Sequence, residues 1–350
     1  MLFKSVVKAA LVATVLAQPV QHQHHQHEKK DVITRTVVVT KGVEEAAAAA
    51  PTQAAAASSA GSDSVVLSSV VTSSVASGTA SSASSVASSV SSGSFSAPVK
   101  GITYSPYAAD GSCKAQSQVK SEIEALADYE IIRLYGVDCN QVEYVLAAMP
   151  SSQKLFAGIY FVDKIEEGVS TLAAAVKAAN GWDQVHTVSI GNELVNSGAA
   201  TVSQIKSYVD AGRTALTAAG YSGPVVSVDT FIAIRNNDGL CEVSDYIAAN
   251  AHAYFDGGIA AANAGSWVAE QHEILTNLCS NKDVLIVESG WPSQGDTNGK
   301  AVAGSSEQKA ALADIADNAS DYTFYFNAYN DLWKDAGYLN CEKYWGIYSS

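Results

Sequence analysis

The sequence predicts an α/β protein whose main domain, residues 100–350, is a closed (β/α)8 TIM barrel preceded by a disordered Ser/Ala-rich tail. Two observations predict the barrel. Eight short apolar runs alternate with segments of helical periodicity across this domain. Two of the runs are apolar on both faces and end abruptly in a glutamate, which is typical of buried parallel strands. An open doubly wound sheet usually carries a Gly-x-Gly-x-x-Gly loop, which the sequence lacks.

The first 99 residues are expected to lie outside the barrel. Residues 1–17 resemble a secretory signal peptide, because two lysines and a short apolar run precede a small-residue cleavage site after Ala17. Residues 18–45 hold four of the seven histidines and the pair Lys29-Lys30, a candidate processing site. We interpret them as a flexible, processed segment, with a metal-binding histidine cluster as the alternative. Residues 46–99 are a low-complexity stalk rich in Ser, Ala and Val, too poor in large apolar side chains to fold alone and suited to O-glycosylation.

Charge and apolar length argue against two classes of partner. A formal net charge of -14 and a pI near 4.8 argue against nucleic acid, which favours a basic face. No apolar run approaches the roughly 20 residues that cross a bilayer. The C-terminus lacks the hydrophobic tail of a lipid-anchor signal. We therefore expect a secreted protein with no membrane span and no lipid anchor.

Each strand of the barrel is predicted from an apolar run. The eight runs are 102–104, 131–135, 155–160, 185–190, 224–229, 249–254, 284–287 and 322–326. Helical periodicity marks the segments 119–126, 142–149, 169–176, 201–220, 267–278 and 306–316. Asn140 with Glu143, and Thr201 with Gln204, are expected to cap helices, and Gly220 is expected to end one.

Two glutamates are the candidate catalytic residues. Glu193 and Glu288 end the fourth and seventh runs, and the C-terminal rim of a parallel barrel is where catalytic residues sit. Glycoside hydrolysis needs two carboxyl groups, one to protonate the leaving oxygen and one to meet the developing oxocarbenium ion. Asn192 lies beside Glu193, where it could bond a sugar hydroxyl. The alternative is that each glutamate is only solvated or caps the next helix. That alternative explains a single glutamate at a strand end more easily than it explains two.

Five motifs resemble those of glycoside hydrolase family 17, in particular its fungal soluble cell-wall glucanases and cell-surface mannoproteins. They are Gly-Ile-Thr-Tyr at 101–104, Arg-Leu-Tyr-Gly at 133–136, Ile-Gly-Asn-Glu at 190–193, Glu-Ser-Gly-Trp-Pro-Ser at 288–293 and the segment 327–334. The resemblance covers residues 101–350. It implies a cell-wall location and a retaining attack on β-1,3-glucan without a cofactor. In that reading Glu193 is the acid/base, Glu288 is the nucleophile and Asn192 bonds the 2-hydroxyl.

One segment departs from the family pattern. Relatives often carry acidic residues where this chain has Asn327 and Asn330, which leaves Asp331 and Lys334 as the charged pair there. Further rim residues follow from strand position and are candidate substrate contacts, with packing or capping as the alternative for each. They are Tyr104, Tyr135, Asp229, Tyr254, Trp291 and Lys334.

Two residues inside strands have specific interpretations. Arg133 lies in the second run, where an arginine needs a carboxylate partner, and we expect it to orient Glu288 and keep it ionised. His252 lies among small residues and is interpreted as a core histidine rather than a catalyst.

Cysteines and one sequon indicate covalent modification. The five cysteines match no zinc spacing, so no metal is expected, and secretion favours disulfides. Cys113 and Cys139 follow adjacent strands and are the best candidates for a bridge, while the odd count leaves one thiol over. Asn318 begins the sequon Asn-Ala-Ser and is the candidate N-glycosylation site.

Two classes of function remain open from the sequence. The first is a glucanase or glucanosyltransferase of cell-wall remodelling, whose partner is wall β-glucan. The second is a cell-surface adhesin or structural mannoprotein that uses the barrel as a binding platform. Glu193, Asn192 and Glu288 favour the first, because a binder needs no second carboxylate. A retaining enzyme requires carboxyl groups about 5 Å apart, and an inverting one requires a wider separation. Hydrolysis and transfer stay undecided at this level.

Overall fold

The computed structural model describes residues 99–179, 181–280 and 282–348. The predicted signal peptide, the segment 18–45 with its histidines and Lys29-Lys30, and the tail up to residue 98 lie outside the described residues. The expectations for those segments therefore stay predictions.

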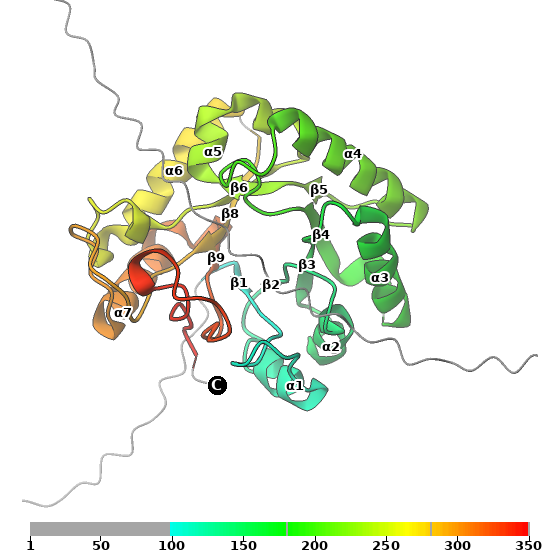
Figure 1. Ribbon diagram of the computed structural model, residues 1–350, viewed down its shortest axis with the longest axis horizontal. Helices are drawn as coiled ribbons and strands as arrows, with labels where there is room; N and C mark the ends of the chain where they lie inside the picture. The colour runs from blue at the N-terminus through cyan, green and yellow to red at the C-terminus, as the bar shows by residue number, and fades with distance from the viewer. Residues whose placement is uncertain (1–98, 180, 281, 349–350) are drawn as a thin grey trace, which may run out of the picture. The chain divides into compact units, whose positions relative to one another are not determined.

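The described strands form one parallel sheet that closes into the predicted (β/α)8 barrel (Figure 1). The strands run in the order β5-β4-β3-β2-β1-β9-β8-β7-β6. β5 and β6 are two pieces of the predicted fifth strand, interrupted at Ser227, whose N–H donates to Ser244 Oγ at 2.8 Å. β5 pairs with β4, and β6 pairs with β7. The segment that contains β5 and β6 therefore joins the first and last strands of this order and closes the barrel. Their bounds are β1 Gly101–Thr103, β2 Ile131–Arg133, β3 Lys154–Ile159, β4 Val185–Ile190, β5 Val225–Val226, β6 Val228–Thr230, β7 Ile247–Asn250, β8 Val284–Ser289 and β9 Thr323–Tyr325.

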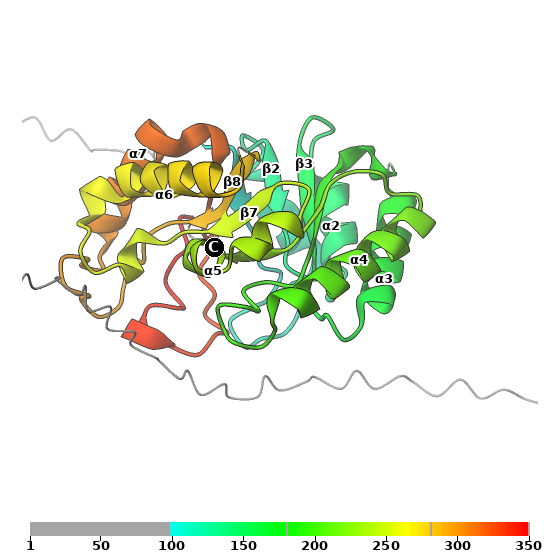
Figure 2. The same ribbon diagram turned by 90° about the horizontal axis from the view of Figure 1, so that it is seen from above.

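Helices surround the strands, as Figure 1 shows. The α-helices of the described residues are α1 Gln116–Glu124, α2 Gln141–Ala148, α3 Ile165–Ala178, α4 Val202–Ala218, α5 Phe231–Asn236, α6 Ala264–Leu278 and α7 Ser305–Ala319. The short α5 was not among the sequence expectations. After β9 the described chain continues in loops with a 3₁₀ turn at Tyr338–Asn340 rather than in an eighth α-helix. Figure 2 shows α6 and α7 side by side, and a Cβ on Gly265 would lie 1.9 Å from the Asp314 carbonyl oxygen.

The two predicted caps have different outcomes. Thr201 and Gln204 form the expected capping box at the start of α4. Gly220 follows the end of that helix with φ +93°, as predicted for a stop. The Asn140 cap prediction is wrong, because Asn140 has φ 50° and its side chain makes no cap hydrogen bond. A capping side chain needs extended backbone to reach the helix N–H groups.

The barrel interior is apolar in its middle and polar at the C-terminal rim. A separate core cluster, carried almost entirely by strands, consists of Ile131, Phe156, Val226, Val228, Tyr246, Ala248, Val287 and Phe324. Side chains alternate along a strand, so Arg133, two residues after Ile131, and Asn250, two after Ala248, face the same interior. In β8 the register shifts so that Asn250 pairs with Glu288, and this bulge turns Glu288 toward the same side.

Disulfides join segments of the barrel. Cys113 is bonded to Cys139, as predicted, and connects the loops that follow β1 and β2. A second bond joins Cys241 to Cys279, and Cys341 is the buried thiol left over. Asn318 is exposed on the last turn of α7, so its glycosylation stays a prediction.

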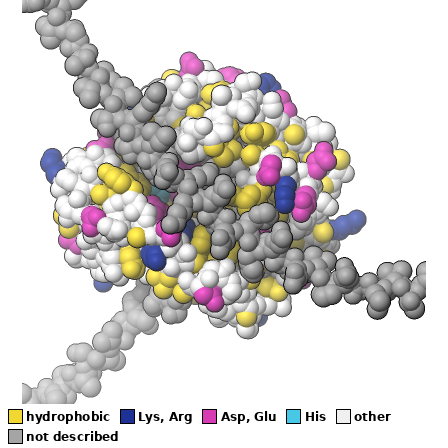
Figure 3. Space-filling model, viewed as in Figure 1, with side chains coloured by type: hydrophobic (Ala, Val, Ile, Leu, Met, Phe, Trp, Pro, Cys, Tyr) yellow, Lys and Arg dark blue, Asp and Glu magenta, His cyan; other side chains and the backbone are white. Residues whose placement is uncertain are grey.

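The surface carries a mixture of side chains. On the face shown in Figure 3, basic side chains of the described residues are scattered among acidic ones and hydrophobic areas. No helix within residues 99–348, as far as they are described, has the length and apolar character to cross a membrane.

We predict that a protein starting at residue 99 folds like the full chain. Residues 46–97 offer few large apolar side chains, whereas Val99 is buried and the Lys100 N–H donates to the Ser320 carbonyl. The midpoint of thermal unfolding should agree with that of the full protein within about 2 °C. A matched protein starting at residue 102 loses those contacts and part of β1, and its midpoint should be lower. Loss of cooperative unfolding in the residue-99 protein would contradict the prediction.

Candidate active site

Arg133 is the centre of a polar cluster at the C-terminal rim. Its side chain is 1% exposed. Nη1 donates to Glu288 Oε1 at 2.9 Å, to the Val287 carbonyl at 2.9 Å and to Asn250 Oδ1 at 3.2 Å. Nη2 donates to Asn192 Oδ1 at 2.9 Å. A buried guanidinium needs such acceptors, and Glu288 is the carboxylate that the sequence analysis expects beside it.

Glu288 is a buried carboxylate held from both of its oxygens. Oε1 accepts from Arg133 and, at 2.7 Å, from the Tyr135 hydroxyl. Oε2 lies 3.2 Å from His252 Nε2, which donates in the tautomer that carries its proton there. Burial by itself raises the pKa of Glu288, but the Arg133 charge and the bonds from His252 and Tyr135 outweigh it and lower the pKa to about 2. The group is therefore ionised at neutral pH.

Glu193 is presented by a tight turn at the end of β4. Gly191 has φ +74° and Glu193 itself has φ +53°, so the chain reverses immediately after the strand. The Glu193 N–H donates to the Val228 carbonyl at 2.9 Å. The next backbone N–H groups, of Val195 and Asn196, donate to the Asp229 carboxylate at 2.8 and 3.1 Å. Strand β6 thus fixes the turn that carries Glu193.

The pKa of Glu193 is shifted in the opposite direction to that of Glu288. Burial, followed by the negative charge of Glu288, raises the pKa of Glu193 to about 7, although Asn250 Nδ2 donates to its Oε1 at 2.8 Å and opposes the shift. At neutral pH Glu193 is therefore protonated in about half of the molecules, whereas Glu288 is ionised. Opposite shifts in one site are the physical mark of an acid and a nucleophile.

Asn192 is oriented by its neighbours. Its Oδ1 accepts from Arg133 Nη2 and from Asn250 Nδ2, the latter at 3.3 Å. With the oxygen engaged, the amide N–H groups have no acceptor within the described part of the chain. They are left to donate to a ligand hydroxyl beside Glu193.

Three of the other predicted substrate contacts lie in or near the polar cluster. Tyr135 belongs to the cluster, with its ring 4.5 Å from the Arg133 guanidinium. Lys334 pairs with Asp331 at 3.0 Å and lies over the Phe326 ring. Both carboxylate oxygens of Asp229 accept backbone N–H groups, so Asp229 supports the Glu193 turn instead of presenting a free oxygen to a sugar.

Three aromatic residues require a correction. Tyr104, Tyr254 and Trp291 are fully buried, so the structure does not put them where a sugar could stack. Their polar atoms are also engaged: Tyr104 donates to Glu122 at 2.7 Å, Trp291 to the Val302 carbonyl at 2.8 Å, and Tyr254 to the Asp296 carbonyl. The sequence prediction used only the position of these residues after strands, and that position does not show which parts of the chain cover their rings.

Sequence reasoning missed two members of the site. Asn250 touches both Glu193 and Arg133, and a polar side chain inside an otherwise largely apolar run was the available signal. His252 does pack against aromatic rings, with centroid distances of 4.9 Å to Trp345 and 5.3 Å to Phe326. The core interpretation of His252 is nevertheless incomplete, because Nε2 contacts Glu288.

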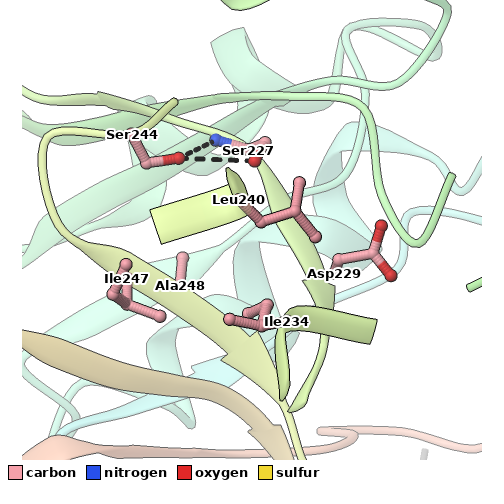
Figure 4. Close-up of a pocket in the computed structure, with 7 residues that line it drawn as sticks. All are labelled: Ser227, Asp229, Ile234, Leu240, Ser244, Ile247 and Ala248. Atoms are coloured by element: carbon pink, nitrogen blue, oxygen red, sulfur yellow. Dashed lines mark hydrogen bonds between the residues drawn. The ribbon is translucent and has the colours of Figure 1, made fainter. Parts of the chain in front are cut away.

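A small cavity lies elsewhere, beside β6 and β7 (Figure 4). Its volume is about 10 Å³, room for at most one water molecule. Figure 4 shows Ser227 and Ser244 bonded to each other on one side and the Asp229 carboxylate turned away. This cavity is too small for a sugar. Within the described residues no group of three His, Cys, Asp or Glu side chains is arranged to hold a metal ion.

The chain matches a known family and several curated relatives. Residues 101–346 match the family model described as the BtgE/BtgC glycoside hydrolase domain. A cell surface mannoprotein of Candida albicans is 57% identical over 256 residues, covering 73% of this chain and 68% of the relative. A probable family 17 glucosidase of Saccharomyces cerevisiae is 57% identical over 252 residues, covering 72% and 65%. A probable β-glucosidase of Aspergillus fumigatus is 35% identical over 254 residues, and the match covers 71% of this chain but only 45% of the relative.

Solved structures confirm the fold. The glycoside hydrolase family 17 β-1,3-glucanosyltransferase from Rhizomucor miehei superposes with a TM-score of 0.61. The sequence identity is 20%, and the match covers 72% of this chain and 93% of that one. At this sequence identity the superposition shows that the two proteins share the barrel fold. With the curated relatives, it confirms the resemblance drawn from the motifs.

We predict opposite stability changes for the two glutamates. The folded-state pKa of Glu193 lies above the ordinary 4.5, so this group lowers stability as pH rises from about 4.5 to about 7. Glu193→Gln should therefore be more stable than the natural protein at pH 8, by about 2 kcal/mol, and nearly equal at pH 4. Urea unfolding at both pH values measures the difference.

Glu288→Gln is the matched control. The folded-state pKa of Glu288 lies below 4.5, so its stabilisation is present above about pH 4.5 and is lost as pH falls toward about 2. Removing the charge also leaves Arg133 without its carboxylate partner, so stability at pH 7 should fall by about 3 kcal/mol. Changes of the same sign in the two variants at pH 8 would contradict this account.

Proposed function

The chain belongs to the BtgE/BtgC glycoside hydrolase domain family, and we propose that it is a secreted, retaining β-1,3-glucan-active enzyme of the fungal cell wall. The observation that carries the proposal is the pair Glu193 and Glu288, one half-buried and one buried carboxyl group on the same rim, with pKa values shifted in opposite directions. Relatives named as a cell surface mannoprotein and a family 17 glucosidase support the wall location and the substrate class. Retention requires the carboxyl groups to lie about 5 Å apart.

In the first step Glu193 acts as acid and Glu288 as nucleophile. The Glu193 carboxylic acid gives its proton to the glycosidic oxygen as the bond from that oxygen to the anomeric carbon breaks. A Glu288 carboxylate oxygen forms a new bond to the same carbon. Oε2 suits this attack better than Oε1, because Oε1 already accepts from Arg133 and Tyr135 whereas Oε2 has only His252. The leaving sugar departs with the proton.

In the second step Glu193 changes from an acid to a base. Once Glu288 is esterified, its negative charge is gone, and with it one of the causes that raise the pKa of Glu193. Glu193, now a carboxylate, takes a proton from water or from a glucan hydroxyl. The resulting oxygen attacks the anomeric carbon, and Glu288 leaves as a carboxylate. Two inversions restore the β configuration.

Asn192 and Arg133 act on binding and orientation. The free amide N–H groups of Asn192 donate to the sugar 2-hydroxyl, a contact that strengthens in the transition state. Arg133 orients both Glu288 and Asn192, since it donates to each of them. Loss of Arg133 therefore disturbs the nucleophile and the 2-hydroxyl contact together.

Adhesion or a structural role in the wall is the second candidate function. The 57% identity to a cell surface mannoprotein favours it. It differs from the enzymatic proposal in an observable way, because a binding platform leaves the lengths of oligosaccharide products unchanged.

We predict separate effects for the two catalytic residues. Glu288→Gln removes the nucleophile and should abolish turnover of laminari-oligosaccharides. Glu193→Ala should lower turnover of the same substrates by about 10²- to 10⁴-fold, yet spare the first step on an aryl glucoside whose leaving group needs no protonation. Steady-state kinetics with both substrates test this. Normal turnover of the aryl glucoside by Glu288→Gln would show that the roles are assigned wrongly.

We also predict that the acceptor concentration decides the product. The covalent intermediate at Glu288 is intercepted by water or by a second glucan chain, and wall polysaccharide supplies acceptors at high local concentration. Purified protein should yield mostly hydrolysis at low laminari-oligosaccharide concentration and elongated products at high concentration. Product chromatography measures the ratio. A protein that binds these sugars but gives neither shorter nor longer products would support the adhesion candidate instead.

A further inference from the structure

Exposed large hydrophobic side chains of the described residues gather on one end of the barrel. Nearly all of them lie in segments that follow the C-terminal ends of strands, the end that carries Glu193 and Glu288. They are Tyr160, Phe161, Ile232, Phe255, Val302, Leu332 and Tyr338, with Leu278 at the end of α6 as the exception. Among them, Phe255 and Tyr338 come from different loops and lie side by side, with ring centroids 6.5 Å apart.

A series of rings leads from Glu288 outward. His252 contacts Glu288, and its ring centroid lies 6.0 Å from that of Phe255. Phe255 lies 6.5 Å from Tyr338, with the two ring planes 31° apart. Exposure rises along the series, since His252 is mostly buried, Phe255 is 39% exposed and Tyr338 is 62% exposed. The rings therefore form a continuous series from the buried Glu288 carboxylate to an exposed part of the rim.

The turn that presents Tyr338 is held in an unfavourable conformation. Leu339 has φ +59° and Asn340 has φ +52°, in the left-handed region that a leucine rarely adopts. The turn, drawn in red in Figure 1, is fastened to a distant loop. The Asp296 N–H donates to the Leu339 carbonyl at 2.7 Å, and Asn340 Nδ2 donates to Asp296 Oδ2 at 2.6 Å. Strain of this kind persists where surrounding structure imposes it, often at ligand clamps.

Packing of Tyr338 does not account for this turn. With 62% of its surface exposed, Tyr338 buries little of its ring in the protein. The clamp from Asp296 therefore fixes a largely solvent-facing ring beside Phe255. Preorganised rings bind a ligand with a smaller loss of conformational entropy.

We propose that Phe255 and Tyr338 form a further glucan-binding subsite, at least one sugar unit beyond those that touch the catalytic carboxyl groups. The inference rests on the proposed function, because continuity with Glu288 through His252 is what identifies the occupant as the same polysaccharide chain. The apolar face of a pyranose stacks on such rings. Its hydroxyl groups meet the Tyr338 hydroxyl and the polar pair Asp296 and Asn340 beside the turn.

Binding of laminari-oligosaccharides of increasing length tests the subsite. The background is Glu193→Gln, which should keep a folded barrel and should consume the ligand about 10²- to 10⁴-fold more slowly than the natural protein. Tyr338→Ala and Phe255→Ala should each weaken Kd for long oligosaccharides by about three- to tenfold, and the loss should be smaller for the shortest ones. Tyr338→Phe keeps the ring and should restore most of the affinity. Calorimetric titration gives Kd, and thermal unfolding checks that each variant is folded.

Leu278→Ala is the matched control, since Leu278 is 39% exposed like Phe255 but lies away from the rim. It should leave Kd unchanged for every length. Ring variants that bind all lengths as tightly as the background protein overturn the subsite and leave the proposed function intact. An equal loss in Leu278→Ala overturns it as well. A background protein that binds no oligosaccharide, together with a natural protein that makes no products, overturns the proposed function and this inference with it.

Discussion

The buried ion pair between Arg133 and Glu288 is the interaction on which the rest of the site depends. A guanidinium inside a barrel is tolerable only when acceptors surround it, and here those acceptors are the side chains of Glu288, Asn192 and Asn250 and the Val287 carbonyl. Satisfying the charge therefore orients the other polar residues of the rim. The same charge keeps Glu288 ionised despite its burial.

The ion pair also contributes to the state of Glu193. Burial, followed by the negative charge of the ionised Glu288, makes ionisation of Glu193 costly, so Glu193 retains its proton to higher pH. The surroundings stabilise the anionic form of Glu288 and destabilise the anionic form of Glu193. The raised pKa of Glu193 reduces the stability of the folded protein at neutral pH, whereas the lowered pKa of Glu288 increases it. Opposite shifts of this kind are what an acid and a nucleophile of the same residue type require.

Loops from distant parts of the chain complete the surface around this pair. Asp229 of β6 fixes the turn that bears Glu193, and Asp296, in the loop after β8, holds the turn that bears Tyr338. The Cys113–Cys139 bond ties together the segments after β1 and β2. The strands thus supply the reacting groups on a rigid frame, while the loops decide which side chains a polysaccharide meets.

The sequence by itself determined the barrel, the positions of Glu193 and Glu288, the Thr201 cap and the first disulfide, because these follow from local periodicity and from the order of parallel strands. Tertiary structure alone decided which rim side chains are accessible. Tyr104, Tyr254 and Trp291 follow the C-terminal ends of strands but are buried, whereas Phe255 and Tyr338 are left exposed. The bulge that turns Glu288 toward Asn250, and the contact that joins His252 to the carboxylate, likewise arise from pairing between strands. Local patterns record which residues lie on a strand, and burial depends on what packs over it.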